Sequence, residues 1–232
     1  WLSKPIDGNI KTIIVKRDNI GDFYICISLE LEQSNHRVAT GKSVGIDFGL
    51  KTFLTLDDKS EIEAPLYHLK NLPKLKRLNR NLSRKKKGSN GRFRAKQQLA
   101  KLHIKTANQR RDYFHKLSNQ LAYNYDNIFI EDLNMKAMQM MWGRKISDLA
   151  FSEFVTILEV KSNVTKIDRF YPSSKTCSKC GHVLKELDLK IREWTCPSCE
   201  AQHQRDVNAA LNIKRVGTST LAGEVVRATS VA

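Results

Sequence analysis

The stretch SVGIDFGLKTFLTL, residues 43–56, decides the fold class of this 232-residue chain. It holds two short apolar runs, residues 43–49 and 52–56, which we predict as β-strands because they are rich in β-branched and aromatic residues. The turn sequence DDKS follows at residues 57–60, and residues 61–64 predict a third strand. Consecutive strands with short connections pair with one another, so the sequence predicts an antiparallel meander.

Upstream of the meander, two further apolar runs predict a β-hairpin. Residues 13–15 and 23–29 are separated by the turn-forming sequence NIGD at residues 19–22. Cys26 lies inside the second run, and we expect it to be a small core hydrophobe without a catalytic role.

Downstream of the meander, the hydrophobic pattern changes to the period of a helix. Leucines recur at helical spacing between residues 67 and 123, and KGSNG at residues 87–91 divides this region into two helices. Beyond it we predict a strand at 127–132, a helix at 149–160, a strand at 166–170 and a helix at 206–215. These elements predict an α/β protein with a helical-hairpin insertion, followed by a flexible tail from residue 217.

Two Cys-x2-Cys knuckles near the end of the chain predict a zinc ribbon. They are formed by Cys177 and Cys180 and by Cys196 and Cys199, with fifteen residues between the knuckles. Each knuckle aims two thiolates at one point, so the pair completes a tetrahedral sulfur site. The alternative is two disulfides, which form in oxidising compartments. Because no signal peptide is visible, we favour zinc over disulfides.

Three ring side chains lie in or beside the knuckles. His182 and His203 could each replace a cysteine as a zinc ligand, although four thiolates already fill the tetrahedron. Trp194 is expected to pack over a knuckle as part of a small core. A site made of four thiolates leaves no open position for water, so the expected zinc is structural.

The positive charge of the chain is confined to one segment. The net charge is +16, and residues 70–116 hold 17 Lys and Arg against one acid, Asp112, whereas the remaining chain has 23 charges of each sign. A solvated helical face would normally mix the two signs, so the segment indicates a polyanionic partner, most commonly nucleic acid. Phe93 is a candidate for base stacking. The expected nucleic-acid-binding residues are Lys76, Arg77, Arg80, Arg84, Lys85, Lys86, Lys87, Arg92, Arg94, Lys96, Arg110 and Arg111.

Three acids occupy positions that predict a metal-dependent site. Asp47 interrupts an apolar strand and Glu131 ends another, although a buried charge is costly unless it is paired or bound to a metal. Asp206 begins the last helix. Each acid alone has another explanation: Asp47 as a turn or cap residue, Glu131 as the partner of a lysine, and Asp206 as a first-turn acid that the helix dipole favours. Together they resemble the layout of two-metal phosphodiester hydrolysis. Asp132 is predicted to face the other way and to be structural.

The residues that flank these acids resemble a known family. VGIDFGLK at residues 44–51 resembles the first motif of RuvC-like nuclease domains, and IFIEDLNM at residues 128–135 resembles the second. The sequence from YPSSKTC at 171–177 to RDVNAALNI at 205–213 resembles the zinc ribbon and third motif of the TnpB (OrfB) proteins of bacterial insertion sequences. The resemblance covers about residues 10–216.

The resemblance implies a compact RNA-guided DNA nuclease related to type V CRISPR effectors. Its fold would be an α/β RNase H-like (RuvC) domain with a basic helical-hairpin insertion and an inserted zinc ribbon. Asp47, Glu131 and Asp206 would bind two Mg²⁺ or Mn²⁺ ions, and Arg205 and Asn208 would support them or face phosphate. The implied domains are an N-terminal β wedge remnant at 1–40, a nuclease core at 41–170 with the basic hairpin at 66–123, the zinc ribbon at 171–204, the last helix at 205–216 and the tail at 217–232.

The resemblance also implies partners and a location. DNA, a guide-type RNA and a transposase encoded by the same element are the expected partners, in the bacterial cytoplasm at the nucleoid and away from membranes. Because residues 1–40 match only the last strands of the family's N-terminal region, we expect an N-terminally truncated chain. Two alternatives stay open: a catalytically silent DNA- or RNA-binding regulator or decayed fragment, and a recombinase that joins transposon ends.

Overall fold

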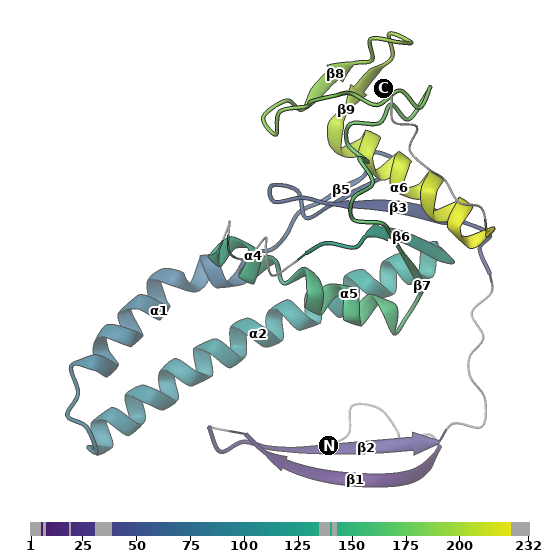
Figure 1. The fold of residues 1–232 in the computed structure, drawn as a ribbon. Helices are drawn as coiled ribbons and strands as arrows, with labels where there is room; N and C mark the ends of the chain where they lie inside the picture. The colour runs from purple at the N-terminus through teal and green to yellow at the C-terminus, as the bar shows by residue number, and fades with distance from the viewer. Residues whose placement is uncertain are drawn as a thin grey trace. The chain divides into compact units, whose positions relative to one another are not determined.

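The computed structural model describes residues 6, 8–18, 20–30, 39–134, 140 and 143–223 (Figure 1). The chain divides into two compact units, one formed by residues 1–39 and 71–108 and the other by residues 40–70 and 109–232. None of the helices among the described residues is long and apolar enough to cross a membrane.

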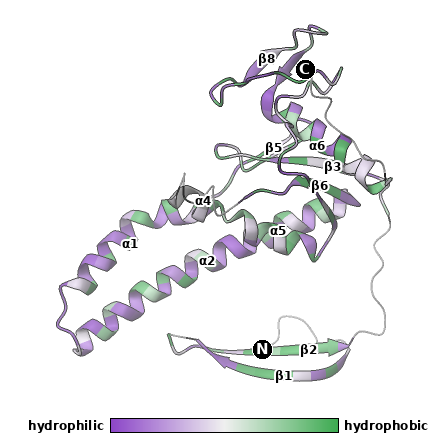
Figure 2. Ribbon diagram, in the orientation of Figure 1, coloured by the Kyte–Doolittle hydropathy of each residue, from purple (hydrophilic) through white to green (hydrophobic). Residues whose placement is uncertain are grey.

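The first unit contains the predicted hairpin. Strands β1 (Asn9–Arg17) and β2 (Phe23–Glu30) pair antiparallel, and Asp18 accepts backbone hydrogen bonds from Ile20 and Asp22 in the turn. Hydrophobic residues occur along both strands (Figure 2). The expectation that Cys26 is a core residue is wrong, because its side chain is exposed along with most of β2.

The predicted helical hairpin is confirmed. It consists of α1 (Tyr67–Ser83) and α2 (Asn90–Asn124), with the break where KGSNG predicted it. In the first unit Leu75, Ala95 and Leu102 are buried between largely hydrophilic outer faces (Figure 2). The helices therefore hold together through a narrow apolar seam and expose their cations.

The second unit is built on a mixed five-stranded sheet. Its strands are β3 (Ser43–Phe48), β4 (Leu54–Leu56), β5 (Glu61–Ile62), β6 (Asn127–Glu131) and β7 (Asn163–Ile167), in the order β5-β4-β3-β6-β7. The predicted meander of β3, β4 and β5 is confirmed, and β6 and β7 run parallel to β3 and to each other.

The bounds of β7 differ from the prediction of a strand at 166–170. The strand begins at Asn163 and ends at Ile167, because each of its residues pairs in parallel register with β6, from Asn127↔Asn163 to Glu131↔Ile167. Pairing with a buried neighbour strand outweighed the weak local pattern, which is the usual relation between strand propensity and context.

The two faces of the sheet are covered by different helices (Figure 1). Side chains at alternate positions of β3 and β6, among them Ile46 and Ile130, pack against Phe114 of α2 and Phe154 of α5 (Phe151–Glu159). The short helix α4 (Arg144–Leu149) adds Leu149 to this core. The predicted helix at 149–160 is thus present as α5, with α4 before it.

The last helix covers the other face. Helix α6 (Arg205–Leu221) packs Ile213 and Val216 against Phe129 and Ile167 of the sheet. It continues five residues into the predicted tail 217–232, because Gly217 is buried against the sheet and keeps the helix docked. Residues 224–232 of that predicted tail lie outside the described residues.

Two glycines set the distance between α6 and the sheet. A Cβ at Gly45 of β3 would lie 2.1 Å from the carbonyl oxygen of Ala210, and one at Gly217 would lie 2.2 Å from the ring of Phe129. Each of these helix–sheet contacts is therefore closer than any other residue type allows.

The zinc-ribbon segment adds a two-stranded sheet. Strands β8 (Glu193–Thr195) and β9 (Gln202–Gln204) pair antiparallel, and Gln204 connects β9 directly to the start of α6. A single bridge between Thr176 and Val183 closes the first knuckle.

Gly45→Ala should destabilise the second unit, because the added methyl group meets backbone rather than a flexible side chain. Overpacking of this kind costs about 1–3 kcal/mol or more, so we expect the melting temperature to fall by roughly 5–10 °C in a thermal scan. Gly91→Ala is the matched control, since a Cβ there meets only side-chain atoms at 3.9 Å. Equal melting temperatures for Gly45→Ala and the unsubstituted chain would contradict the close approach.

Candidate active site and metal centre

Asp47 and Glu131 lie side by side on the sheet face that α6 covers. Their strands are neighbours in parallel register, with Ile46 paired to Ile130. Side chains alternate between faces along a strand. Gly45 and Phe129 contact α6, so Asp47 and Glu131, two residues further along each strand, face the same side.

Asp206 joins them from the first turn of α6. The helix begins at Arg205, and the side chain of Gln204 accepts a hydrogen bond from the backbone N–H of Val207 at 2.7 Å. Both carboxylate oxygens of Asp206 accept from Nη1 of Arg192, at 3.0 and 2.9 Å. The guanidinium group of Arg192 is therefore a cation already placed on this acid.

The electrostatics of Asp47 show that the three acids converge. Burial raises the pKa of Asp47 well above its usual range, and the charges of Glu131 and Asp206 raise it further. The positive charges of Arg205 and Arg192 oppose this shift in the pKa. A carboxylate that is destabilised by two other carboxylates is suited to binding a cation.

Glu131 is held by a hydroxyl group from the loop after β7. The side chain of Ser173 donates a hydrogen bond to Oε1 of Glu131. Burial raises the pKa of Glu131, and the Ser173 hydrogen bond works in the opposite direction. The hydrogen bond fixes one carboxylate oxygen of Glu131.

The arrangement provides hard oxygen ligands from three separate elements. Asp47, Glu131 and Asp206 offer carboxylate oxygens of the kind that Mg²⁺ and Mn²⁺ prefer. The charges of Glu131 and Asp206 act on Asp47, and the joint role of the three acids as metal ligands stays a prediction. Asp132, one residue after Glu131, instead forms an ion pair with Arg169, consistent with its predicted structural role.

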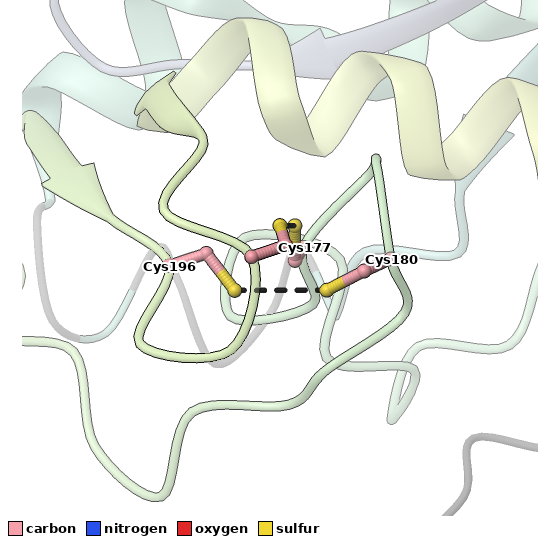
Figure 3. Close-up of side chains that lie close together, drawn as sticks. Cys177, Cys180 and Cys196 are labelled. Carbon is pink, nitrogen blue, oxygen red and sulfur yellow. Dashed lines mark hydrogen bonds between the residues drawn. The ribbon is translucent and has the colours of Figure 1, made fainter.

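The four cysteines form a compact cluster. Their sulfur atoms all lie within 4.8 Å of one another, with Cys177–Cys199 at 3.7 Å and Cys180–Cys196 at 3.6 Å (Figure 3). A tetrahedron with Zn–S bonds of about 2.3 Å has sulfur–sulfur edges of ~3.8 Å, which the shorter separations match. The donor set and its spacing thus fit one zinc ion in a closed structural site.

Backbone and ring groups contact individual thiols of the cluster. The backbone N–H of His182 is the main cause that lowers the pKa of Cys180, to about 7. Nε2 of His203 lies 3.0 Å from the sulfur of Cys177, and burial lowers the pKa of this histidine. A neutral His203 can donate to the Cys177 thiolate, so the structure places it beside the cluster rather than in the ligand tetrahedron.

The predicted packing of Trp194 is confirmed. It is buried with Cys177 and Cys196, and its ring lies beside that of His203 at a centroid distance of 4.6 Å and an interplanar angle of 42°. Leu184 and Leu187 complete this small cluster. The ribbon therefore has a minimal apolar core that cannot hold it together alone, which is why such modules depend on metal.

Two buried asparagines of α6 bind the ribbon. Asn208 accepts from the backbone N–H of Ser178 and donates to the carbonyl of Thr176, and Asn212 donates to the carbonyls of Ser173 and Thr176. Asn208 is 1 % exposed, so it does not face phosphate. Arg205 donates to the carbonyl of Asp188 while its charge lowers the pKa of Asp47.

Sequence reasoning missed three residues of this site. Asn212 had a readable signal, because it stands four residues after Asn208 on one helix face. Ser173 lies inside the sequence YPSSKTC, residues 171–177, but no local pattern there predicts its hydrogen bond to Glu131. Arg192 has no local signal at all, since its contact with Asp206 depends on how the ribbon folds back onto α6.

The predicted nucleic-acid-binding residues fall into two groups. Arg92 donates to the carbonyls of Leu82 and Lys85, and Arg110 and Arg111 form ion pairs with Glu153, so these three have contacts within the protein. Arg111 is nevertheless exposed, and so are the other nine: Lys76, Arg77, Arg80, Arg84, Lys85, Lys86, Lys87, Arg94 and Lys96. Phe93 is also exposed. In the first unit a groove between α1 and α2 adds cations that the sequence reasoning omitted, namely Lys74, Lys101 and Lys105.

The stability of the metal-free site should depend on pH. Because the pKa of Asp47 is higher in the folded than in the unfolded state, its contribution favours folding at pH below about 4 and is lost as the pH rises through the folded pKa. Asp47→Asn should therefore lose less stability than the unsubstituted chain over this rise. Thermal melting after dialysis against Mg²⁺-free buffer from pH 4 to 8 measures the difference.

Added Mg²⁺ or Mn²⁺ at pH 8 should raise the melting temperature of the unsubstituted chain more than that of Asp47→Asn. Glu131 has a pKa shift of the same sign, so the substitution should reduce the pH dependence rather than abolish it. Parallel pH curves for the two proteins would contradict the raised pKa of Asp47.

Cys196→Ser should lose the zinc and most of the solubility of the chain, since Cys196 is fully buried in the cluster. Elemental analysis should find about one zinc per chain before the substitution and none after it. Cys26→Ser is the control, because that thiol is exposed and distant in sequence from the knuckles. Unchanged zinc content and melting behaviour in Cys196→Ser would remove the stabilising role of the metal.

Comparisons with known proteins agree with this architecture. A family model described as "Probable transposase" (OrfB_IS605) matches residues 26–141, half of the chain. A second model, described as "Cas12f1-like, TNB domain", matches residues 151–213, which contain the cysteine cluster and most of α6. In structure the chain resembles a protein solved as the "Cryo-EM structure of the Cas12f1-sgRNA-target DNA complex", with a TM-score of 0.62 at 22% identity over 87% of this chain and 44% of that one.

Curated relatives extend the match along the chain. A Streptomyces pristinaespiralis protein named "Putative RNA-guided DNA endonuclease" is 37% identical over 97% of this chain and 58% of its own length. The Escherichia coli (strain K12) protein named "Putative RNA-guided DNA endonuclease InsQ" is 32% identical over 97% of this chain and 61% of its own length. The chain thus spans about three fifths of these relatives. With half of its residues matched by the family model, the chain belongs to the TnpB/OrfB (OrfB_IS605) family of probable transposases.

Proposed function

We propose that this chain is the nuclease part of a TnpB-like RNA-guided DNA endonuclease and hydrolyses DNA phosphodiester bonds. The observation that carries the proposal is the convergence of Asp47, Glu131 and Asp206 on the α6 face of the sheet. A mixed sheet whose central strands and last helix each supply one acid supports an RNase H-like (RuvC-like) core. The names of the curated relatives support the same activity.

The three acids are the proposed ligands of two Mg²⁺ or Mn²⁺ ions. The donor set fits, since it consists of carboxylate oxygens whose mutual repulsion has only partial compensation from arginine. Bound there, the ions would activate a water nucleophile and stabilise the leaving oxygen. Ser173 orients Glu131, and the packed α6 holds Asp206 at a fixed distance from the two strands.

Arg192 has a second part in this proposal. Its guanidinium group binds Asp206 and is itself partly exposed, so it can leave the carboxylate when a divalent cation arrives. Arg205 stays bound to the backbone of Asp188 and keeps a positive charge near Asp47. Asn208 and Asn212 of α6 fix the loop that carries Ser173 and leads into the first cysteine knuckle.

The basic helical hairpin is the proposed nucleic-acid-binding surface. Its exposed cations provide the sequence-independent attraction to phosphates that both a DNA substrate and a guide-type RNA need. DNA and RNA partners are therefore part of the proposal, as is a partner transposase from the same element and a bacterial, nucleoid-associated location. In this proposal the helical hairpin binds nucleic acid, and Asp47, Glu131 and Asp206 hold the metal ions that hydrolyse it.

Asp47→Ala should abolish cleavage of labelled single-stranded DNA in the presence of Mg²⁺. We expect the rate to fall at least about 100-fold, since even partners that only orient a metal ligand contribute 10- to 100-fold. Glu131→Gln and Asp206→Ala should behave in the same way. Asp58→Asn is the matched control, because Asp58 is a turn acid that bonds the backbone of Ser60 and lies outside the proposed ligand set.

The same gel separates the alternatives. Equal products for the unsubstituted chain and Asp47→Ala would favour a catalytically silent binding protein. Products longer than the substrate, lost in Asp47→Ala, would indicate strand joining and a recombinase.

A further inference from the structure

One exposed aromatic side chain stands beside the proposed active site. Phe170 is 85% exposed, although a phenylalanine is among the residues most often buried. It lies in the loop between β7 and the first cysteine knuckle, three residues after Ile167, and Ile167 pairs in register with Glu131. Phe170 therefore comes shortly after the carboxyl end of β7, and Glu131 lies at the same end of the neighbouring strand β6.

The backbone around Phe170 is fixed rather than loose. The side chain of Asp168 accepts from the backbone N–H of Phe170 at 2.8 Å, and its carbonyl accepts from the N–H of Tyr171 at 3.1 Å. The turn thus fixes the backbone of Phe170 while its ring stays exposed.

Both flanks of the turn are tied to the strand that carries Glu131. Before Phe170, Arg169 forms an ion pair with Asp132. After it, Ser173 donates to Glu131, and Arg215 of α6 donates to the hydroxyl group of Tyr171 at 3.2 Å. The position of the Phe170 ring is thus coupled to the position of the acid through contacts on either side.

The chemistry of the surroundings indicates what covers this ring. A protein side chain could bury it. However, residues 70–116 of this chain carry a large excess of positive charge, which indicates a polyanionic partner. The acids of the proposed active site are suited to phosphodiester chemistry. A strand whose phosphate reaches those acids carries a base one nucleotide away on either side. Unstacked bases offer a π-face that aromatic side chains bind without regard to sequence.

We propose that Phe170 stacks on an unpaired nucleobase next to the scissile phosphate and so positions a single DNA strand across Asp47, Glu131 and Asp206. The inference rests on the proposed nuclease function and assigns it a strand-positioning residue. Duplex DNA would not bind in this way, because its bases are already stacked on one another.

Tyr123 provides a matched comparison within the same unit. It is also an exposed aromatic residue, at 77%, but it lies near the end of α2, just before β6 begins. Because Glu131 lies at the carboxyl end of β6 and Tyr123 comes just before its amino end, the two residues flank opposite ends of this strand. Substituting Tyr123 removes a comparable ring from the surface without touching the proposed strand path.

The test uses the zinc-bound 232-residue chain in Mg²⁺-free buffer, so that binding is measured without cleavage. Single-stranded DNA oligomers, each with 2-aminopurine at one position, report stacking as quenched fluorescence. We expect quenching at one position that Phe170→Ala abolishes, Phe170→Trp preserves and Tyr123→Ala leaves unchanged. Phe170→Ala should bind the oligomer about 5- to 150-fold more weakly, the loss that one stacked base represents.

Two outcomes would overturn the inference, and a third would separate it from the nuclease proposal. Unchanged quenching and affinity in Phe170→Ala, with an unchanged melting temperature, would show that the ring contacts no base. An RNA oligomer of the same sequence is measured in parallel. If Phe170→Ala weakens binding of the RNA oligomer but not of the DNA oligomer, Phe170 contacts RNA instead. If quenching depends on Phe170 but neither this chain nor Asp47→Ala cuts DNA after Mg²⁺ is added, the stacking site stands and the nuclease proposal fails.

Discussion

The close approach of α6 to the sheet is the constraint on which the rest of the second unit depends. Glycine at position 45 lets the carbonyl of Ala210 come within 2.1 Å of where a side chain would begin, and Gly217 does the same for Phe129. Between these contacts Ile213 and Val216 bury the middle of the helix. Asp206 is one turn before Ala210, so this packing decides how far Asp206 lies from the acids on the strands.

The start of α6 is held by polar contacts as tightly as its middle is held by packing. Asn208 and Asn212 insert into the loop before the first knuckle and satisfy backbone groups of Ser173, Thr176 and Ser178. Buried hydrogen bonds of this kind specify geometry because an unmade one is costly. Through Ser173 the same loop reaches Glu131. The ribbon segment, residues 171–204, thus contacts Glu131 through Ser173 and Asp206 through Arg192, which gives the closed metal site an indirect part in the proposed chemistry.

Negative charge is concentrated at the proposed active site, and positive charge is concentrated on the helical hairpin. Burial and, after it, the charges of Glu131 and Asp206 raise the pKa of Asp47, and the arginines nearby compensate this only in part. The helical hairpin instead holds cations with almost no acids among them. A polyanion and a few divalent cations would relieve both imbalances at once, and this is the electrostatic basis of the proposed function.

The sequence by itself determined the elements and most of the chemistry. Alternating apolar residues at 43–56 specify the meander, the leucine spacing and KGSNG specify the helical hairpin, and the cysteine spacing specifies the sulfur cluster, because each of these is a local pattern. Only the tertiary structure decided which residues meet from different elements: the pairing of Arg192 with Asp206, the anchoring of Glu131 by Ser173 and the exposure of Cys26. The register of β7 and the docking of Gly217 likewise follow from neighbours far away in the sequence, and no local pattern records such contacts.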